Sequence, residues 1–467
     1  MRLLPPALAI ALLFPAAAQA AQTALDGTAL GFAWVLPFAG LLLSIALVPL
    51  FAPRFWHRHD GTVAALWSIA VITPMVVAFG FGTALEELLH IALLDYVPFI
   101  ILLTALFVIT GGIRVSGNFT GTPAANVSML GAGTLLAGWM GTTGASMLLI
   151  RTIITANRER RYNTHVLVFF IFLVSNIGGA LSPLGDPPLF LGFLRGVEFF
   201  WPTIHLLPPT MLTAGVLLCV FFLLDSFLYR REDAVAASDA APGNFRVQGG
   251  LNFVFLTGVI VAVMLSGGFD LGTAFTVHGI AISWQSLLRD VALVGLLLAS
   301  LHLGDRHARA QNHFSWGPIK EVAKIFAGIF VTIIPPLAML RAGHGGALAG
   351  VLDWLHVDGE PVNTTFFWLT GALSSFLDNA PTYVVFFNAA GGDPHHLMGP
   401  LATTLMAISA GAVYMGAITY IGNAPNFMVK SIAETHAIRM PSFFGYMGWS
   451  ILFLVPVFAL VTLVFFH

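Results

Sequence analysis

Apolar residues run along this chain in long stretches, separated by short polar segments. Ten stretches have about the length of a membrane span: 31–50, 61–80, 91–111, 164–194, 209–229, 251–267, 287–303, 319–340, 400–428 and 443–466. A helix of about 20 apolar residues crosses the hydrocarbon core of a bilayer. The pattern therefore predicts an all-α polytopic membrane protein with about ten transmembrane helices.

Two further apolar stretches carry polar residues at their midpoints. Residues 127–150 contain GTTGAS, and residues 362–388 contain LDNAPT. Irregular polar backbone inside a membrane is tolerated only where protein or a water-filled cavity surrounds it. We interpret both stretches as re-entrant hairpins, which enter the membrane and return to the side from which they came.

The distribution of basic residues favours the hairpins. If the mature chain starts outside the cytoplasm and both hairpins return, the cytoplasmic loops hold 16 of the 20 Lys and Arg residues, as the positive-inside rule requires. A hairpin that crossed the membrane would move every later loop to the other side. The 16 residues are Arg54, Arg58, Arg114, Arg151, Arg158, Arg160, Arg161, Arg230, Arg231, Arg246, Arg306, Arg309, Lys320, Lys324, Lys430 and Arg439.

Two segments lie outside this membrane pattern. Residues 1–20 have one basic residue, a short apolar run and the ending AQA, which together predict a signal peptide cleaved after Ala20. The alternative is a first transmembrane helix, but three prolines leave it shorter than a span. Residues 231–250 are small and polar, which predicts a flexible cytoplasmic linker.

The linker separates two halves, 21–230 and 251–467, that we interpret as inverted repeats. A shift of 237 residues places ALSPLGDPPLF (180–190) on AITYIGNAPNF (417–427) and the first hairpin tip on the second. Each half then has five spans, including one broken helix (164–194 or 400–428), and one hairpin. Inverted repeats with broken helices are typical of secondary transporters.

Composition agrees with this picture and excludes other classes. The chain is 57% hydrophobic and 9% charged, with a mean hydropathy of +0.88, and it contains 47 glycines and 26 prolines. No basic run indicates a nucleic-acid partner. The single cysteine, Cys219, excludes a disulfide framework and a cysteine metal site. We expect no cofactor.

Two acidic residues at the breaks are the main candidates for chemistry, Asp186 and Asp378. An acidic residue deep in a membrane is costly and marks a functional site by default. The alternative is that each caps a helix. Oxygen-bearing side chains nearby are candidate ligands for a hard cation: Asn379, Thr382, Asn176, Ser182, Thr419, Asn423, Thr142 and Thr143. Asp95 and Asp225 are weaker candidates for a proton path.

The motifs LDNAPT, SNIGGALSPLGDPP and GNAPN resemble the ion transporter superfamily, and within it the branch of NhaD-like sodium:proton antiporters and CitMHS-like citrate transporters. The resemblance covers almost the whole mature chain. It implies a homodimer in a bacterial inner membrane, with a scaffold domain and a moving transport domain that works like an elevator.

These observations favour a secondary transporter that exchanges Na⁺ or Li⁺ for protons. No basic residue lies in the break elements, so a carboxylate would have to be held by amides and hydroxyls alone. Cation-coupled transport of citrate or a dicarboxylate remains the alternative, because helix N-termini bind anions. Arsenite efflux is a third hypothesis. A channel does not need inverted broken helices, and no catalytic set indicates an enzyme.

Overall fold

The structure is a computed structural model that describes residues 25–117, 119–232 and 246–467. The predicted signal peptide and most of the predicted linker lie outside these residues. The chain is an all-α polytopic membrane protein, with only three short pairs of antiparallel strands in the described part: β1 (Arg114–Ser116) with β2 (Arg246–Gln248), β3 (Thr273–Val277) with β4 (Ile280–Ser283), and β5 (His356–Val357) with β6 (Glu360–Pro361).

Within the described residues, eight helical segments are long and apolar enough to cross a membrane. They are Phe32–Phe51, Pro53–Gly111, Thr164–Leu181, Trp201–Tyr229, Gly250–Gly268, Trp284–Leu303, Gly317–Arg341 and Phe443–Phe465. This number is lower than the predicted ten spans for two reasons. The spans at 61–80 and 91–111 belong to one continuous segment, which bends at Gly80 (φ 87°). The stretch at 400–428 is divided into two shorter helices.

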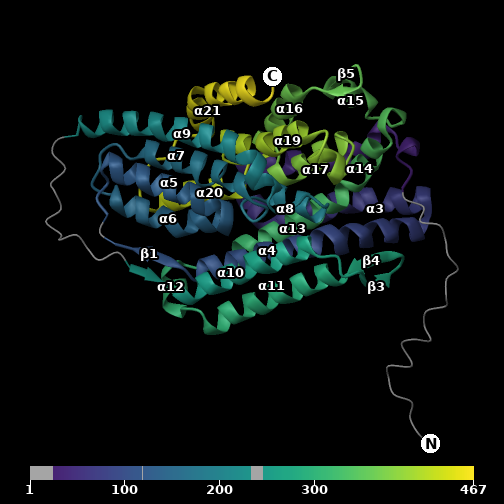
Figure 1. Cartoon of the computed structure of the whole chain (residues 1–467), viewed down its shortest axis with the longest axis horizontal. Coiled ribbons are helices and arrows are strands. Elements are labelled where there is room, and N and C mark those ends of the chain that lie inside the picture. The colour runs from purple at the N-terminus through teal and green to yellow at the C-terminus, as the bar shows by residue number, and fades with distance from the viewer. Residues whose placement is uncertain (1–24, 118, 233–245) are drawn as a thin grey trace, which may run out of the picture.

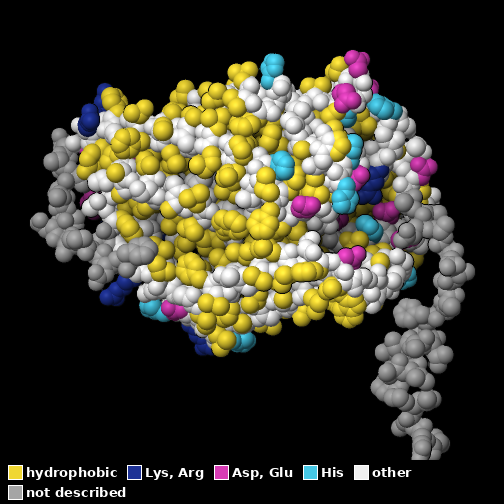
Figure 2. All heavy atoms as spheres, in the orientation of Figure 1, with side chains coloured by type: hydrophobic (Ala, Val, Ile, Leu, Met, Phe, Trp, Pro, Cys, Tyr) yellow, Lys and Arg dark blue, Asp and Glu magenta, His cyan; other side chains and the backbone are white. Residues whose placement is uncertain are grey.

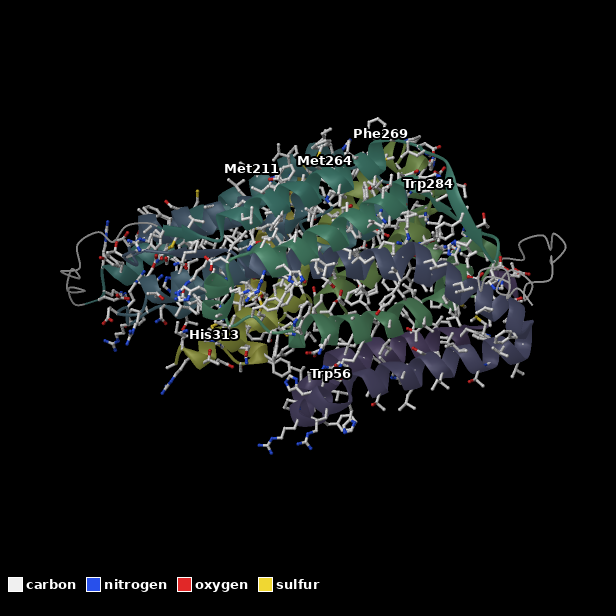
Figure 3. The ribbon with its side chains drawn as sticks, turned by 90° about the horizontal axis from the view of Figure 1, so that it is seen from below. Trp56, Met211, Met264, Phe269, Trp284 and His313 are labelled. Carbon is white, nitrogen blue, oxygen red and sulfur yellow. The ribbon has the colours of Figure 1, made fainter. Side chains whose placement is uncertain are left out.

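The helices form two layers, seen one above the other in Figure 1. In the lower layer, each helix packs on others of the same layer. Figure 3 shows this layer from below, with Trp56 on α3 near one edge and Met264 on α10 near the other. Its members are α2 (Leu36–Phe51), α3 (Pro53–Ile91), the π-helix η3 (Ala92–Tyr96), α4 (Val97–Gly111), α10 (Gly250–Gly268), α11 (Trp284–Leu303) and α13 (Gly317–Thr332). Helix α14 (Ile334–Arg341) continues from α13 and packs on α17 (Asn379–Ala389) of the upper layer.

The upper layer holds both hairpins and both broken helices. Its members are α5 (Pro123–Met140), α6 (Thr142–Ala156), α7 (Thr164–Leu173), η4 (Ile177–Leu181), α8 (Pro187–Leu194), α9 (Trp201–Tyr229), α16 (Asn363–Phe376), α17 (Asn379–Ala389), α19 (Ala402–Met415), η6 (Gly416–Ile418), α20 (Ala424–Thr435) and α21 (Phe443–Phe465). Short elements complete the described chain: η1 (Gly27–Ala29), η2 (Phe32–Val35), α12 (Arg306–Gln311), η5 (Gly343–Gly345), α15 (Ala349–Leu355) and α18 (Pro394–Met398).

Burial differs sharply between these helices. Helix α7 reads THVLVFFIFL and is buried from His165 to Leu173, as expected of a helix that is hydrophobic on all sides. Helix α11 of the lower layer buries few residues and exposes Leu288, Val291 and Leu298. Its apolar surface suits contact with lipid, because side chains facing the bilayer core need no polar partner.

Charge is divided between the two ends of the helices. In Figure 2, hydrophobic side chains cover the middle of the visible face, Lys and Arg gather at the left end, and Asp and Glu lie mostly toward the right. We call the left end the basic face and the right end the opposite face. The positive-inside rule predicts that the basic face is cytoplasmic.

Each predicted hairpin is a pair of packed helices, of which the first exceeds its predicted bounds and the second is shifted by one residue. Helices α5 and α6 run from Pro123 to Ala156 rather than over 127–150, and their far end bonds to β1, where Thr152 Oγ1 donates to the Val115 carbonyl at 3.1 Å. Helices α16 and α17 occupy Asn363–Ala389. In the stretch predicted as the first broken helix, α8 ends at Leu194, and in the second, α20 ends at Thr435.

Candidate functional site

The two breaks lie between short helices whose starts are set by proline. Helix α8 begins with Pro187 and Pro188, and α20 has Pro425 at its second position. Proline suits the first turn of a helix, where its missing N–H would have no partner in any case. The residues just before these helices, Ser182–Asp186 and Thr419–Asn423, therefore leave the helical path.

Glycines allow these breaks to fold tightly. A Cβ built on Gly185 would lie 2.2 Å from the Gly179 carbonyl oxygen, and one on Gly422 would lie 2.6 Å from the Gly416 carbonyl oxygen. A side chain at either position would therefore collide with backbone. The 237-residue shift relates Gly185 to Gly422 and Gly179 to Gly416, so the two close contacts occupy matching positions.

The hydroxyls of Ser182 and Thr419 tie each break to a hairpin. Ser182 Oγ donates to the Gly138 carbonyl, and Thr419 Oγ1 donates to the Ser375 carbonyl. Each hydroxyl also accepts from a backbone N–H two residues further on, at 3.1 and 3.2 Å. All members of these two sets are related by the 237-residue shift. The inverted repeat stays a prediction, and these paired contacts support it.

Asp186 lies where the two breaks and both hairpin tips meet. Its carboxylate accepts from Thr142 Oγ1 at 2.9 Å, from Asn423 Nδ2 at 3.1 Å, and from Asn379 Nδ2. The residue is 2% exposed and occupies the N-cap position of α8, but its side chain makes no capping bond there. It therefore binds side chains from both hairpins and from the second break instead of its own helix.

Asp378 has a different environment. It is the N-cap of α17, and its Oδ1 accepts from the Ala380 N–H at 3.1 Å. This is the capping arrangement that the sequence left open. The side chain of Asp378 nevertheless lines the same cavity as Asp186, so a capping role and a binding role are compatible.

Asn379 carries a free acceptor at this site. Its amide nitrogen donates to Asp186, whereas its Oδ1 is buried and has no hydrogen-bond donor among the described residues. A buried polar atom without a partner is costly. An amide oxygen of this kind is a suitable ligand for a hard cation.

The remaining predicted residues lie around this centre with different partners. Asn176 donates to Asn426 Oδ1 at 2.7 Å and accepts from Asn423 at 3.3 Å, one step away from Asp186. Thr382 Oγ1 donates to the Asp378 carbonyl at 3.0 Å, which uses the hydroxyl within the helix. Thr143 lines the cavity.

Sequence reasoning missed Asn426 and Ser175. Asn426 is fully buried and donates to the carbonyls of Gly416 and Thr419, at 2.8 and 2.9 Å, which holds the second break in shape. Ser175 shares a hydrogen bond of 2.8 Å with Ser146 on the first hairpin. The 237-residue shift places Asn426 on Leu189. A polar residue where the other half has an apolar one is a signal that could have pointed to Asn426.

A cavity of about 570 Å³ lies between the two layers and reaches this centre. Asp186, Asp378, Thr142, Thr143 and Asn423 line its inner end. Its outer lining includes the start of α3 and of α13 and the residues Ser431 and Ile432 of α20. Those ends carry Arg54, Arg58 and Lys320, so the cavity leads to the basic face.

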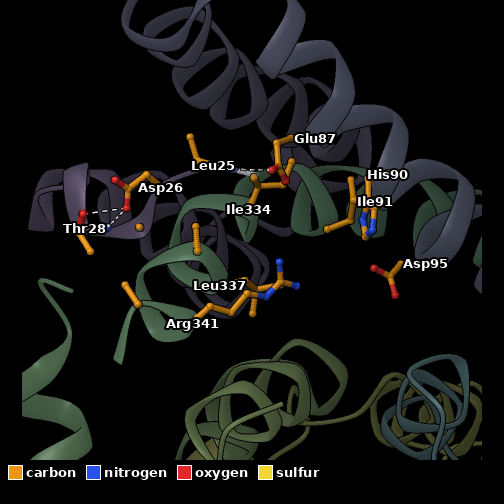
Figure 4. Close-up of a pocket in the computed structure, with 13 residues that line it drawn as sticks. Leu25, Asp26, Thr28, Glu87, His90, Ile91, Asp95, Ile334, Leu337 and Arg341 are labelled. Carbon is orange, nitrogen blue, oxygen red and sulfur yellow. Dashed lines mark hydrogen bonds between the residues drawn. The ribbon is translucent and has the colours of Figure 1, made fainter. Parts of the chain in front are cut away.

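A second cavity, of about 270 Å³, lies toward the opposite face (Figure 4). Glu87, His90, Asp95 and Arg341 are among the residues that line it. Asp95 also pairs at 3.0 Å with Arg195, the residue that follows α8, and this contact links the lower layer to the upper. We predicted Asp95 as a candidate for a proton path, and its main partner is this arginine.

Asp225, the other weak candidate, lies in a separate buried cluster near the basic face. Its carboxylate contacts Arg160 at 2.5 Å, His165 Nε2 at 2.8 Å and Asn126 at 2.9 Å. These partners join α5, α7 and α9. The cluster fastens the first hairpin to its neighbours, because a buried charge is stable only when paired.

Comparison with known proteins agrees with this architecture. Two uncharacterized transporters, from Mycobacterium bovis and Mycobacterium tuberculosis, are each 26% identical to the chain over 417 residues, covering 84% of this chain and 91% of theirs. The sequence profile of a family described as "Putative citrate transport" matches residues 27–466. The chain therefore belongs to this family of membrane transport proteins.

Proposed function

We propose that this transporter exchanges Na⁺ or Li⁺ for protons across a bacterial inner membrane. Membership of a transport family and the transporter relatives support the general function and set it apart from enzymes. The choice of ion rests on the site. We also propose that the protein is a homodimer and that the upper layer moves against the lower like an elevator.

One observation carries the proposal. Among the described residues, those that line the cavity between the layers include Asp186, Asp378 and Glu321, and none of them is Lys or Arg. A cavity with this lining has a negative potential, which attracts cations and disfavours a carboxylate substrate. Carboxylate and amide oxygens are the ligands that hard cations prefer. Asp186, Asp378 and Asn379 Oδ1 supply both kinds.

Exchange for protons follows from the same residues. A carboxylate held in a poorly hydrated site can accept either a proton or a cation, and it binds one at the expense of the other. Asp186 and Asp378 therefore release Na⁺ when they are protonated and bind it when they lose the proton. The alternation couples the two gradients.

Citrate is the second candidate, and two observations favour it. The family description names citrate. Helices α6, α8, α17 and α20 also begin at the hairpin tips and breaks, and the N-terminus of a helix favours an anion. For a carboxylate to bind, these N-termini must outweigh Asp186 and Asp378, so we place this function second.

Transport in vesicles distinguishes the two functions. Inside-out vesicles containing the protein are energised, and a pH-sensitive dye reports the proton gradient while NaCl, LiCl or KCl is added. We expect Na⁺ or Li⁺ to dissipate the gradient and KCl to leave it intact. Right-side-out vesicles are tested with labelled citrate. Citrate uptake without any effect of Na⁺ or Li⁺ would reject the exchange proposal, and vesicles without the protein are the control.

A further inference from the structure

The cavity between the layers is much larger than a metal ion requires. Its volume is about 570 Å³, within the range of about 300–1,000 Å³ that is usual for sites of small organic molecules. A water molecule in the liquid occupies about 30 Å³. The space beyond the ion-binding end is therefore large enough for a bicyclic organic molecule.

The walls of this space are apolar and aromatic. Leu106, Phe107, Phe190, Phe326, Tyr420 and Phe427 all line it, and they come from both layers. Such walls hold apolar groups and gain little from a hydrated inorganic ion. Aromatic faces also attract a cation placed against them.

The charged residues around the cavity determine whether a cationic or an anionic ligand is favoured. Asp186 and Asp378 lie at its inner end, and Glu321 lies toward the basic face. In the described part of the chain, His57 is the one lining residue that can carry a positive charge. Lys430 lies over the rings of Tyr420 and Phe427 at 5.5 and 5.9 Å, but it is paired with Glu434 at 2.9 Å and does not line the cavity.

We propose that this cavity is also a binding site for amphipathic organic monocations, which place their apolar body between the two layers and their charge against Asp378 and Asp186. Such a molecule holds the layers in the present arrangement and blocks the ion-binding end. Binding itself follows from the cavity alone. The competition with Na⁺ rests on the proposed function.

Three naphthalene compounds of nearly equal size test the site: 2-naphthylmethylammonium, the neutral 2-naphthylmethanol and the anionic 2-naphthylacetate. Their binding to the purified full-length protein is measured by calorimetry in a potassium buffer. We expect the ammonium compound to bind at least about tenfold more tightly than the alcohol, since the difference reports the charge contact. The acetate should not bind measurably.

Two variants locate the contacts. Asp378→Asn should reduce the preference for the ammonium compound, because Asp186 still lines the cavity, and should leave weak binding of the alcohol unchanged. Phe427→Ala should weaken the binding of both compounds by a similar factor, and because Phe427 is 47% exposed the fold should survive its truncation. Melting temperatures of both variants verify folding.

The outcomes separate this inference from the proposed function. Equal binding of the three compounds, or a preference for the ammonium compound that persists in an Asp186→Asn/Asp378→Asn double variant, overturns the site. Exchange of Na⁺ for protons without ammonium binding rejects this inference alone. Ammonium binding that depends on the aspartates but is unaffected by NaCl rejects the competition, and with it the proposed ion, while the site stands.

Discussion

At the scale of single residues, Asp186 and Asp378 line the same cavity but differ in their hydrogen-bond partners. Asp186 is held by three side chains from three separate elements, whereas Asp378 bonds only to the start of its own helix among the described contacts. Removing the charge of Asp186 therefore affects a network, and removing that of Asp378 affects mainly the site.

We expect Asp378→Asn to abolish Na⁺-dependent dissipation of the pH gradient with little loss of stability. Asparagine is also a good N-cap, so α17 should keep its start. Asp186→Asn should abolish the same activity and also lower the melting temperature, because three donors lose their charged acceptor, each contributing about 1.5–3 kcal/mol. Vesicle transport and thermal melts of the two variants provide the comparison. Full transport by Asp378→Asn would limit that residue to capping.

The glycines of the breaks give a second prediction at this scale. Gly185→Ala adds a Cβ at 2.2 Å from the Gly179 carbonyl oxygen, and overpacking of this kind typically costs about 1–3 kcal/mol. We expect a lower melting temperature and reduced transport. Gly215→Ala on α9 is the matched control, since a Cβ there would meet nothing within 4 Å. An unchanged melting temperature in Gly185→Ala would show that the break relaxes easily.

At the scale of elements, the apolar pattern and the polar midpoints predicted where short packed helices lie, and the ends differ by one to seven residues. That the helix pairs are re-entrant hairpins stays a prediction. The sequence could not show which partners Asp186 takes, because Thr142, Asn379 and Asn423 approach it from elements up to 237 residues away. It also could not show the pairing of Asp95 with Arg195. That contact depends on how one layer is placed against the other, and the pattern of apolar and polar residues within a segment does not determine this placement.

The ion pair between η3 and α8 is the contact whose loss should change the position of the layers. Asp95 and Arg195 are 3.0 Å apart, with 12% and 14% of their side chains exposed. A charged hydrogen bond in such a setting contributes about 1.5–3 kcal/mol, or roughly ten- to hundredfold in an equilibrium. We expect Arg195→Glu to reduce labelling of a cysteine placed at Ser431 in the cavity, and Asp95→Arg with Arg195→Glu to restore it. No change in labelling would show that the pair does not hold the layers.

At the scale of the whole molecule, the two halves of the predicted repeat are not in equivalent positions. On the opposite face, α8 of the first half contacts η3 through Arg195 and Asp95. The 237-residue shift relates Arg195 to Ile432 on α20. There the cavity separates the layers instead, with Ile432 and Met428 on one wall and Val322 and Ile325 on the other. The two layers are therefore in contact near the opposite face and are separated by the cavity near the basic face.

This asymmetry predicts that the described structure is open to the cytoplasm alone. In a Cys219→Ser background, a cysteine at Ser431 should react with a membrane-impermeant maleimide in inside-out vesicles and not in right-side-out vesicles. A cysteine at the exposed residue His396, on the opposite face, is the matched control and should show the reverse. A Ser431 cysteine labelled only from outside would invert the orientation that the basic residues indicate. Equal labelling from both sides would mean that the two arrangements interconvert freely, because the cavity can then open through either face without the transported ion.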